Sequence, residues 1–237
     1  MPKDIEVGRI ELAYGPMFSH KTEWLIKELD GYKRGHYNVA AFKPKLDNRY
    51  SAEEISSHSG QRFPAFLISS AKDIVQAAMD HPAPHIIGIE EAQFLDDLLL
   101  TAVDDLRARG KIVLINGLLT TFANEPFPFS LGNGKRTMAD LLAIVDDAVR
   151  CYAICTYQQN GVTCGRRDAT RTQRLFPDGK PVPYDDPLIV VGSDKEHERM
   201  EHPRIYEARC SQHHFFSHDG EALTLQELRK RQAAPQC

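Results

Sequence analysis

A short segment near the start of the chain has the residue types and spacing of a phosphate-binding loop. It begins at Gly15 and ends at Lys21-Thr22, as in the pattern of Gly, four residues, then Gly-Lys-Ser/Thr. In such a loop, backbone N–H groups surround phosphate oxygens, the lysine reaches the outer phosphates and the hydroxyl binds Mg²⁺. His20 stands where the second glycine belongs. The segment predicts a bound nucleoside triphosphate, and an ordinary turn before a helix is the alternative.

Two adjacent carboxylates, Glu90 and Glu91, directly follow the apolar run Ile86–Ile89. Acidic residues at the carboxyl end of a strand in a phosphate-loop fold lie near the metal and the terminal phosphate. One of them would hold Mg²⁺, usually through water, and the other would accept the proton of an attacking hydroxyl. The alternative is a solvated helix start, where acidic side chains are favoured in any case.

Cysteine and histidine residues gather in the part of the chain that follows residue 150. Thiolates and imidazoles are the usual ligands of Zn²⁺, and four of them form a closed tetrahedral structural site. Such a site would fasten both ends of a long loop, and unligated thiols are the alternative. The candidate ligands are Cys155, Cys164, Cys210 and His213, with Cys151 and His214 as rivals nearby.

Apolar runs alternate with helix-like stretches over residues 1–150. Continuous apolar strands separated by helices indicate an α/β fold, in which helices cover both faces of a parallel sheet. One strand and one helix flank the loop at Gly15, which is the context that the phosphate-binding motif requires. The expected strands are 9–14, 39–42, 86–89 and 112–115, and the expected helices are 23–29, 71–79, 95–109 and 139–149.

The composition changes after Arg150, where Cys, Gly, Pro, Asp and Arg increase and helical periodicity fades. A chain of 237 residues can bury one good core with a small appended module. We therefore predict a nucleotide-binding α/β domain at 1–150, a small zinc-binding domain at 151–217 and a C-terminal tail at 218–237 with a helix over 223–232.

Composition and charge limit the classes of partner. The chain has 29 Lys and Arg against 33 Asp and Glu, a net charge of −4, which argues against a dominant nucleic-acid-binding surface. No apolar run reaches the roughly 18 residues that a membrane span needs, and residues 1–8 lack the apolar stretch of a signal peptide. We expect a cytoplasmic protein, so its cysteines are expected to be thiols or metal ligands rather than disulfides.

Taken together, these residues resemble the type II thymidine kinases, the family of the eukaryotic cytosolic enzyme and of many bacterial ones. The likeness runs from about Arg9 to His213, and its Met-Phe-Ser within the loop is more distinctive than a generic phosphate-binding loop. The matching segments are Gly15–Ser19, Ile87–Phe94, Phe42–Pro44, Asp47–Tyr50, Ser57–Gly60, Gly117-Leu118 with Phe122, Pro126-Phe127, Ala169–Leu175, Tyr184–Pro187, Val191-Gly192 and Tyr206–Cys210.

The resemblance implies transfer of the γ-phosphate of ATP to the 5′-hydroxyl of thymidine, with Mg²⁺, in deoxynucleoside salvage for DNA synthesis. By position, Glu91 is the implied general base, and Glu90 is the acid that helps to hold the metal. The implied contacts of ATP and Mg²⁺ are Gly15, Pro16, Met17, Phe18, Ser19, His20, Lys21, Thr22, Glu90, Asp47 and Arg49.

The family holds the base in an aromatic pocket closed by a lasso-like loop, which here corresponds to residues 172–206. Aromatic faces suit a flat base. The resemblance also implies that the four candidate ligands pin this loop as a structural zinc site, and that the assembly is a homotetramer. The implied substrate-binding residues are Phe94, Phe122, Phe127, Thr172, Val191, Gly192 and Tyr206.

Three core positions depart from the family pattern. His20 replaces the loop glycine, Glu90 replaces the aspartate of the metal site, and Leu119 replaces the aspartate of a usual Gly-Leu-Asp. Additional residues also stand around 198–205, within the loop over the substrate. Two alternatives to a working thymidine kinase follow: a catalytically impaired homologue that binds a nucleoside or nucleotide, and a kinase with a shifted nucleoside preference.

Overall fold

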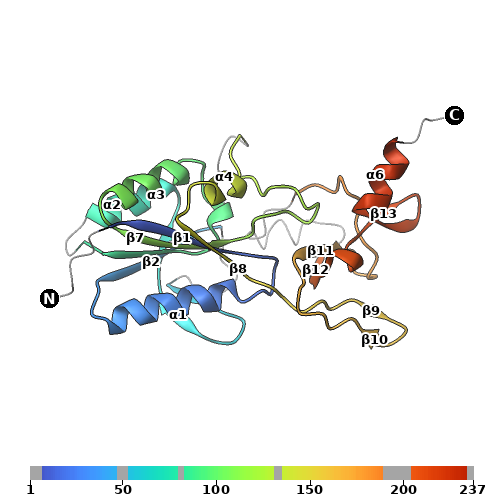
Figure 1. The fold of residues 1–237 in the computed structure, drawn as a ribbon, viewed down its shortest axis with the longest axis horizontal. Coiled ribbons are helices and arrows are strands. Elements are labelled where there is room, and N and C mark those ends of the chain that lie inside the picture. Colours follow the sequence, from blue (N-terminus) through green and yellow to red (C-terminus); the bar gives the residue numbers. More distant parts are fainter. Residues whose placement is uncertain (1–6, 47–52, 80–82, 131–134, 189–203, 234–237) are drawn as a thin grey trace.

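A computed structural model describes residues 7–46, 53–79, 83–130, 135–188 and 204–233. Its centre is a six-stranded sheet in which every neighbouring pair of strands is parallel. The sheet lies in one half of the elongated molecule (Figure 1). Its strands, in spatial order, are β5 (Phe66–Ile68), β2 (Val39–Pro44), β6 (Ile86–Ile89), β7 (Ile112–Gly117), β1 (Arg9–Tyr14) and β8 (Asp147–Arg150).

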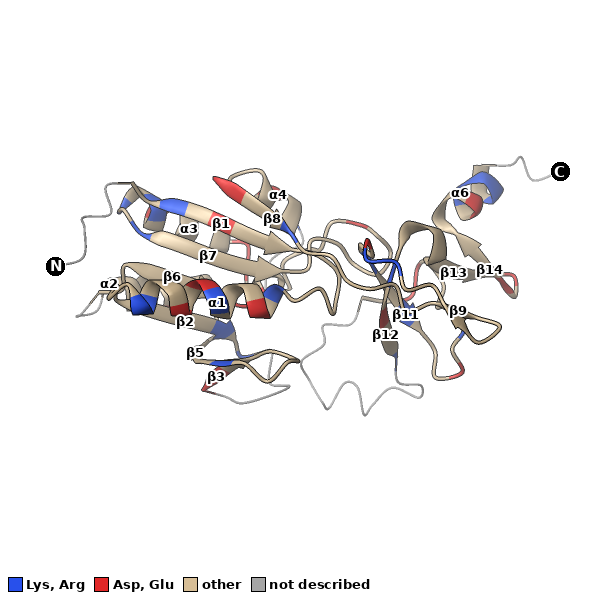
Figure 2. Ribbon diagram, turned by 60° about the horizontal axis from the view of Figure 1, so that its bottom comes forward, with Lys and Arg blue, Asp and Glu red and all other residues tan. Residues whose placement is uncertain are grey.

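Helices cover both faces of this sheet. Helix α1 (Lys21–Arg34) lies on one face, and α2 (Ala71–Met79), α3 (Leu99–Ala108) and α4 (Met138–Leu142) lie on the other (Figure 1). Each layer has its own buried apolar cluster, because β6 and β7 are buried along their whole length and present side chains to both sides. Charges of both signs lie along α1, whose other face packs on the sheet (Figure 2). This is the predicted P-loop NTPase-like α/β architecture.

The other half of the molecule is built from short antiparallel pairs. Their bounds are β9 (Gln158–Gln159) with β10 (Val162–Thr163), β11 (Arg171–Leu175) with β12 (Ile205–Arg209), and β13 (Phe215–His218) with β14 (Glu221–Thr224). A further antiparallel pair, β3 (Glu54–Ser56) with β4 (Arg62–Pro64), lies beside α1. The last helix is α6 (Leu225–Ala233). Two short 3-10 turns are η1 (Ala92–Phe94) and η2 (Ser211–His213). The division of the chain into three domains stays a prediction.

Most predicted elements are confirmed, and four helices differ in extent from the prediction, among them α1, which spans Lys21–Arg34 rather than 23–29. The helix predicted at 139–149 ends at Leu142, and Asp147–Arg150 is the edge strand β8 instead. The reason is tertiary: β8 pairs along β1, and the Asp146 carboxylate accepts a 2.8 Å hydrogen bond from the backbone N–H of Ile10. The helix predicted at 95–109 starts only at Leu99, after the 3-10 turn η1.

The predicted tail helix is α6, which begins at Leu225 rather than at residue 223 because Glu221–Thr224 pairs with β13. Its Leu228 is buried in an apolar cluster with Phe122 and Phe216. Within the described part of the chain, no helix combines the length and the apolar character needed to cross a bilayer.

Candidate functional site

The phosphate-binding segment forms a tight loop between the end of β1 and the start of α1. Lys21 is only 7% exposed, and its Nζ donates a 2.8 Å hydrogen bond to the Pro16 carbonyl. The Ser19 hydroxyl donates to the same carbonyl at 2.8 Å. The loop thus folds around its own lysine at the N-terminus of α1, where the helix dipole and the backbone N–H groups favour anions.

Gly15 permits a close approach between this loop and the segment that follows β8. A Cβ atom on Gly15 would lie 2.3 Å from the Cys151 carbonyl oxygen and 2.7 Å from Ser19 Oγ. The backbone N–H of Cys151 donates a 2.7 Å hydrogen bond to the carbonyl of Tyr14. Glycine is therefore required at position 15 for packing, and burial raises the pKa of the neighbouring Cys151 thiol.

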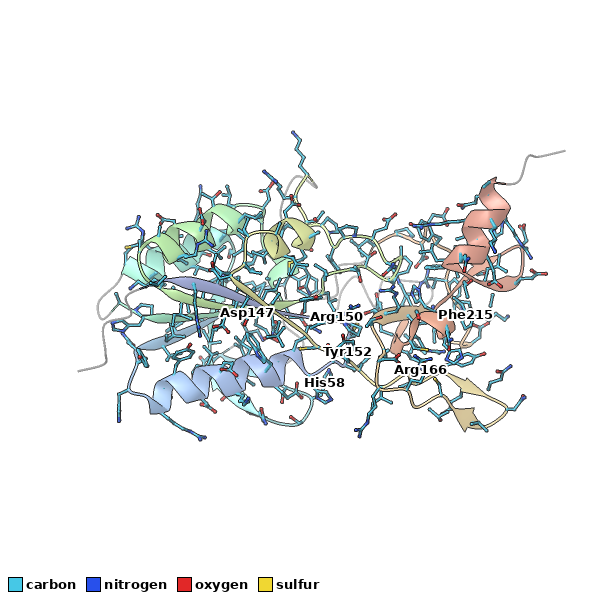
Figure 3. The ribbon with its side chains drawn as sticks, viewed as in Figure 1. His58, Asp147, Arg150, Tyr152, Arg166 and Phe215 are labelled. Carbon is cyan, nitrogen blue, oxygen red and sulfur yellow. The ribbon has the colours of Figure 1, made fainter. Side chains whose placement is uncertain are left out.

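His20 occupies the left-handed region of the backbone, with φ of 61°, which explains why a glycine is usual at this position. Its side chain is 72% exposed, and Nδ1 lies 3.4 Å from Glu23 Oε1. The same Glu23 oxygen accepts a hydrogen bond from Ser59 Oγ at 3.1 Å. The imidazole is therefore directed to the surface, toward Glu23. Beside the loop, Phe18 packs on His58, with ring centroids 5.5 Å apart; His58 is labelled near the start of α1 in Figure 3.

Glu90 joins the loop to the centre of the sheet. Its carboxylate is buried at the end of β6, where Oε1 accepts a 2.7 Å hydrogen bond from Thr22 Oγ1. The other oxygen, Oε2, accepts a 2.5 Å hydrogen bond from Asn116 Nδ2 at the end of β7. The predicted metal-site acid and the predicted metal-binding hydroxyl are thus in direct contact.

Glu91 takes a left-handed backbone conformation, with φ of 46°, and its side chain lines a cavity. Two neighbouring amides fix it. Its backbone N–H donates a 2.9 Å hydrogen bond to Asn116 Oδ1, and Gln93 Nε2 donates to its Oε2 at 2.5 Å. The Oε1 of the fully buried Gln93 accepts a 3.0 Å hydrogen bond from the N–H of Leu118. A strained residue at a cavity wall, held by buried amides, is typical of functional sites.

Sequence reasoning did not assign roles to Asn116 and Gln93. Asn116 carried a signal, because it is the polar residue that ends the apolar run of β7, as Glu90 ends that of β6. Carboxyl ends of neighbouring parallel strands meet at one edge of the sheet, so such residues are expected to be close. Gln93 carried no comparable signal, since its amide reaches Glu91 only through the turn η1.

The cavity beside Glu91 brings together most of the predicted substrate-binding residues. Phe94 and Phe127 meet edge to face, with ring centroids 6.3 Å apart. The Thr172 hydroxyl accepts a 3.1 Å hydrogen bond from the N–H of Met17, which joins β11 to the phosphate-binding loop. The predicted residues that line the cavity are Phe94, Phe122, Phe127, Thr172 and Tyr206, together with Met17 and Glu91.

Leu119 is not among the described residues that line this cavity. Leu119 packs against the main core cluster, and its carbonyl accepts a 2.9 Å hydrogen bond from Phe127. The predicted residues that lie outside the described ranges are Asp47, Arg49, Val191 and Gly192.

A separate cluster brings together the four candidate zinc ligands. One potential ligand atom from each of Cys155, Cys164, Cys210 and His213 lies within 4.8 Å of the others. His213 Nδ1 is 3.4 Å from Cys210 Sγ and 3.7 Å from Cys155 Sγ. Three thiols and one imidazole in such proximity are a donor set that fits a tetrahedral structural Zn²⁺.

The rival ligands lie elsewhere. Cys151 is beside the phosphate-binding loop, and His214 is buried against Phe216, with ring centroids 4.9 Å apart. Burial lowers the pKa of His214 to about 4, so its ring is neutral at physiological pH. Other side chains lie beside the four-residue cluster. The rings of Tyr157 and His213 stack with their centroids 4.4 Å apart, and Phe215 and Arg166, labelled in Figure 3, lie in the same region.

Comparison with known proteins identifies the family. A family model described as thymidine kinase matches residues 8–214. A protein named thymidine kinase, from Thermococcus kodakarensis, is 35% identical over 210 residues, which cover 87% of this chain and 94% of that protein.

Two solved structures have low similarity to the fold. The flagellar accessory protein FlaH from Methanocaldococcus jannaschii matches with a TM-score of 0.41 and 12% identity, over 68% of this chain and 78% of that one. The ATPase DotB from Legionella pneumophila matches with a TM-score of 0.30 and 17% identity, over 49% of this chain and 32% of that one. The order of the parallel strands and the helices on both faces of the sheet establish the fold. From the family model and the archaeal relative, we conclude that the chain belongs to the thymidine kinase family.

Proposed function

We propose that this chain transfers the γ-phosphate of ATP to the 5′-hydroxyl of thymidine. One observation carries the proposal: a continuous path of hydrogen bonds runs from Thr22 at the phosphate-binding loop through Glu90 and Asn116 to Glu91 at the cavity wall. A phosphate donor at the loop and an acceptor hydroxyl in the cavity would therefore meet at the two carboxylates. Family membership supports both substrates.

On the donor side, the backbone of residues 15–22 binds the phosphates of ATP, and Lys21 turns from the Pro16 carbonyl to the outer phosphates. Thr22 and Glu90 are the residues that would hold Mg²⁺, and the ion would supply positive charge beside the phosphates. Asn116 fixes the second oxygen of Glu90 and so orients the carboxylate. By the family resemblance, Asp47 and Arg49 are further candidates for phosphate binding, and both lie outside the described residues.

On the acceptor side, Glu91 takes the proton from the 5′-hydroxyl as that oxygen attacks the γ-phosphorus. Gln93 holds one oxygen of the Glu91 carboxylate, and Glu91 lines the cavity. The rings of Phe94, Phe122 and Phe127 enclose the thymine base, whose flat apolar faces suit aromatic walls. Thr172 and Tyr206 lie on the paired strands β11 and β12 and line the cavity. By the family resemblance, Val191 and Gly192, outside the described residues, are further candidates for substrate binding.

The zinc cluster has a structural role in this proposal. Cys155 precedes β11 in the chain, and Cys210 and His213 follow β12. Zn²⁺ held by these residues would bring together chain segments on both sides of the β11–β12 pair. From the family pattern, we also propose that the chain assembles as a homotetramer.

The exposed position of His20 supports catalysis over the impaired alternative, because its imidazole points to Glu23 instead of into the loop. The test is phosphorylation by the purified chain with Mg-ATP, using thymidine beside deoxyuridine, deoxycytidine, deoxyadenosine and deoxyguanosine. We expect thymidine 5′-monophosphate as the main product. Calorimetric binding of ATP and thymidine without turnover would instead establish the impaired homologue, and a different best substrate would establish shifted preference.

A further inference from the structure

We propose that Asp186 is a positioning residue that sets the shape of the nucleoside cavity through two arginines, the buried Arg174 and the partly buried Arg204. The inference rests on the proposed function, since it concerns the same cavity. Asp186 does not line the cavity itself. It stands behind the wall, and its carboxylate is only 8% exposed.

Arg174 is the first of the two partners, and it is fully buried within β11. Its Nη1 lies 3.0 Å from Asp186 Oδ2 and donates a 2.6 Å hydrogen bond to the Pro187 carbonyl. Its Nε and Nη2 make no hydrogen bond within the described part of the chain. A buried guanidinium with few other partners depends strongly on the carboxylate that it does contact.

Arg204 is the second partner, and its side chain is 14% exposed. Its Nη2 lies 3.0 Å from Asp186 Oδ1, and its Nε donates a 3.2 Å hydrogen bond to Oδ2. This two-point contact fixes both oxygens of the carboxylate and uses the planar fork of the guanidinium.

Arg174 transmits this arrangement to three parts of the cavity wall. Its guanidinium carbon lies 4.8 Å from the ring centroid of Phe122 and 5.9 Å from that of Tyr206, which is directly opposite on β12. The Pro187 carbonyl that it holds immediately precedes Leu188. Phe122, Tyr206 and Leu188 all line the cavity. A shift of one guanidinium would therefore displace two rings and one aliphatic side chain together.

Arg204 supports the same wall from behind. Its guanidinium carbon lies 4.4 Å from the ring centroid of Phe176. Phe176 packs against the apolar cluster that contains Phe122. If Asp186 loses its charge, Arg174 and Arg204 lose the anion that lies between them, and like-charge repulsion then favours their separation. The nucleoside wall then opens, while Lys21 and Thr22, which are held by Pro16 and Glu90, keep their geometry.

A purely structural ion pair and a positioning residue predict different kinetics. Loss of stability alone lowers the amount of active enzyme, so the apparent kcat falls and the KM for both substrates is unchanged. Loss of cavity shape weakens nucleoside binding and leaves ATP binding intact, because binding of each substrate depends on separate contacts. The KM for thymidine and the KM for ATP must therefore be measured together.

The experiment compares Asp186→Asn with Asp178→Asn, which removes an exposed carboxylate 3.0 Å from Lys180 in the same half of the molecule. For Asp186→Asn we expect a rise of about ten-fold in the KM and the calorimetric Kd for thymidine. We expect the KM for ATP to stay within about two-fold, and Asp178→Asn to match the parent. Arg204→Lys keeps the charge but loses the two-point contact, so we expect a smaller rise in the same direction.

The outcomes separate the inference from the function on which it rests. An unchanged KM for thymidine in both Asp186→Asn and Arg204→Lys, with the parent active, overturns the positioning role alone. Equal losses for thymidine and ATP also overturn it. If the parent phosphorylates none of the five deoxynucleosides, the proposed function fails, and the inference fails with it. If Asp186→Asn does not fold, Arg204→Lys decides the question. A raised KM for thymidine with an unchanged KM for ATP supports the positioning role, and an unchanged KM for thymidine overturns it.

Discussion

Thr22 Oγ1 donates a 2.7 Å hydrogen bond to Glu90 Oε1, although the two residues are 68 positions apart in the chain. Thr22 lies in the first turn of α1, which follows β1 after the phosphate-binding loop, whereas Glu90 directly follows β6. Strand β7 lies between β1 and β6 in the sheet. Asn116, at the end of β7, binds the other oxygen of the same carboxylate. The segments that follow three neighbouring strands therefore share one polar network.

Replacement of Glu91 by glutamine should lower kcat by at least about 100-fold, because an amide cannot accept the proton of the attacking hydroxyl. We expect ATP to bind with an unchanged Kd, since Glu91 lies on the cavity side of the site. Steady-state kinetics and calorimetry measure the two effects. Glu54→Gln, which alters a partly exposed carboxylate paired with Arg62, is the control. Turnover close to that of the parent would remove Glu91 as the base.

Replacement of Asn116 by alanine should destabilise the fold by about 2–3 kcal/mol, because the buried Glu90 carboxylate and the Glu91 N–H each lose a hydrogen-bond partner. The Mg²⁺ concentration at half-maximal activity should also rise, since Glu90 is no longer oriented. Urea unfolding and Mg²⁺ titration test the two claims. The control is Asn38→Ala, which removes a side-chain hydrogen bond to the Ala83 carbonyl elsewhere. An unchanged Mg²⁺ requirement would contradict the orienting role of Asn116.

Replacement of His20 by glycine should stabilise the protein by about 1 kcal/mol, because glycine adopts the left-handed backbone at lower cost. His36 has nearly the same φ of 63° and is exposed away from the loop, so His36→Gly is the matched control. We expect similar gains in urea midpoint for both, with an unchanged kcat. If only His20→Gly phosphorylates thymidine, the His20 side chain blocks the parent and the impaired homologue is the right description.

Replacement of Gly15 by alanine should destabilise the loop by about 1–3 kcal/mol and weaken ATP binding, since the new Cβ meets backbone at Cys151. Gly31 is the contrasting position, because a Cβ there has no heavy atom within 4 Å. Within α1, Gly31→Ala should therefore stabilise the protein by about 0.5–1 kcal/mol. Thermal or urea unfolding of both variants shows whether each is more or less stable than the parent. A neutral Gly15→Ala would mean that the loop does not pack on residue 151 as described.

Replacement of Cys210 by serine should reduce the bound zinc of the purified protein and loosen the segments that the cluster connects. The physical reason is that a serine hydroxyl does not replace a thiolate as a ligand of structural Zn²⁺. Elemental analysis gives the metal content, and hydrogen exchange over residues 153–188 and 204–214 reports the loosening. Cys151→Ser is the control and should keep the metal, since Cys151 lies outside the cluster. Equal zinc in the two variants would exclude Cys210 as a ligand.

Local patterns predicted the sheet well, because buried parallel strands are continuous apolar runs. The strands β1 and β6 and the helix α2 have the bounds that the sequence predicted. The same local reasoning failed at β8, where residues 147–150 follow a helix-like stretch. Their strand conformation depends on hydrogen bonds to β1, which is more than a hundred residues distant, and no local pattern encodes such a partner.

The sequence by itself determined the family resemblance, the loop at Gly15, the carboxylate pair and the four candidate metal ligands, because each is a pattern of residue types in order. Only the tertiary structure chose His213 over His214 and placed Asn116 between Glu90 and Glu91. It alone turned His20 to the surface and set Asp186 between two arginines. These features depend on backbone conformation and on the packing of strands that are distant in sequence, where side-chain direction is decided by neighbours that the linear order does not reveal.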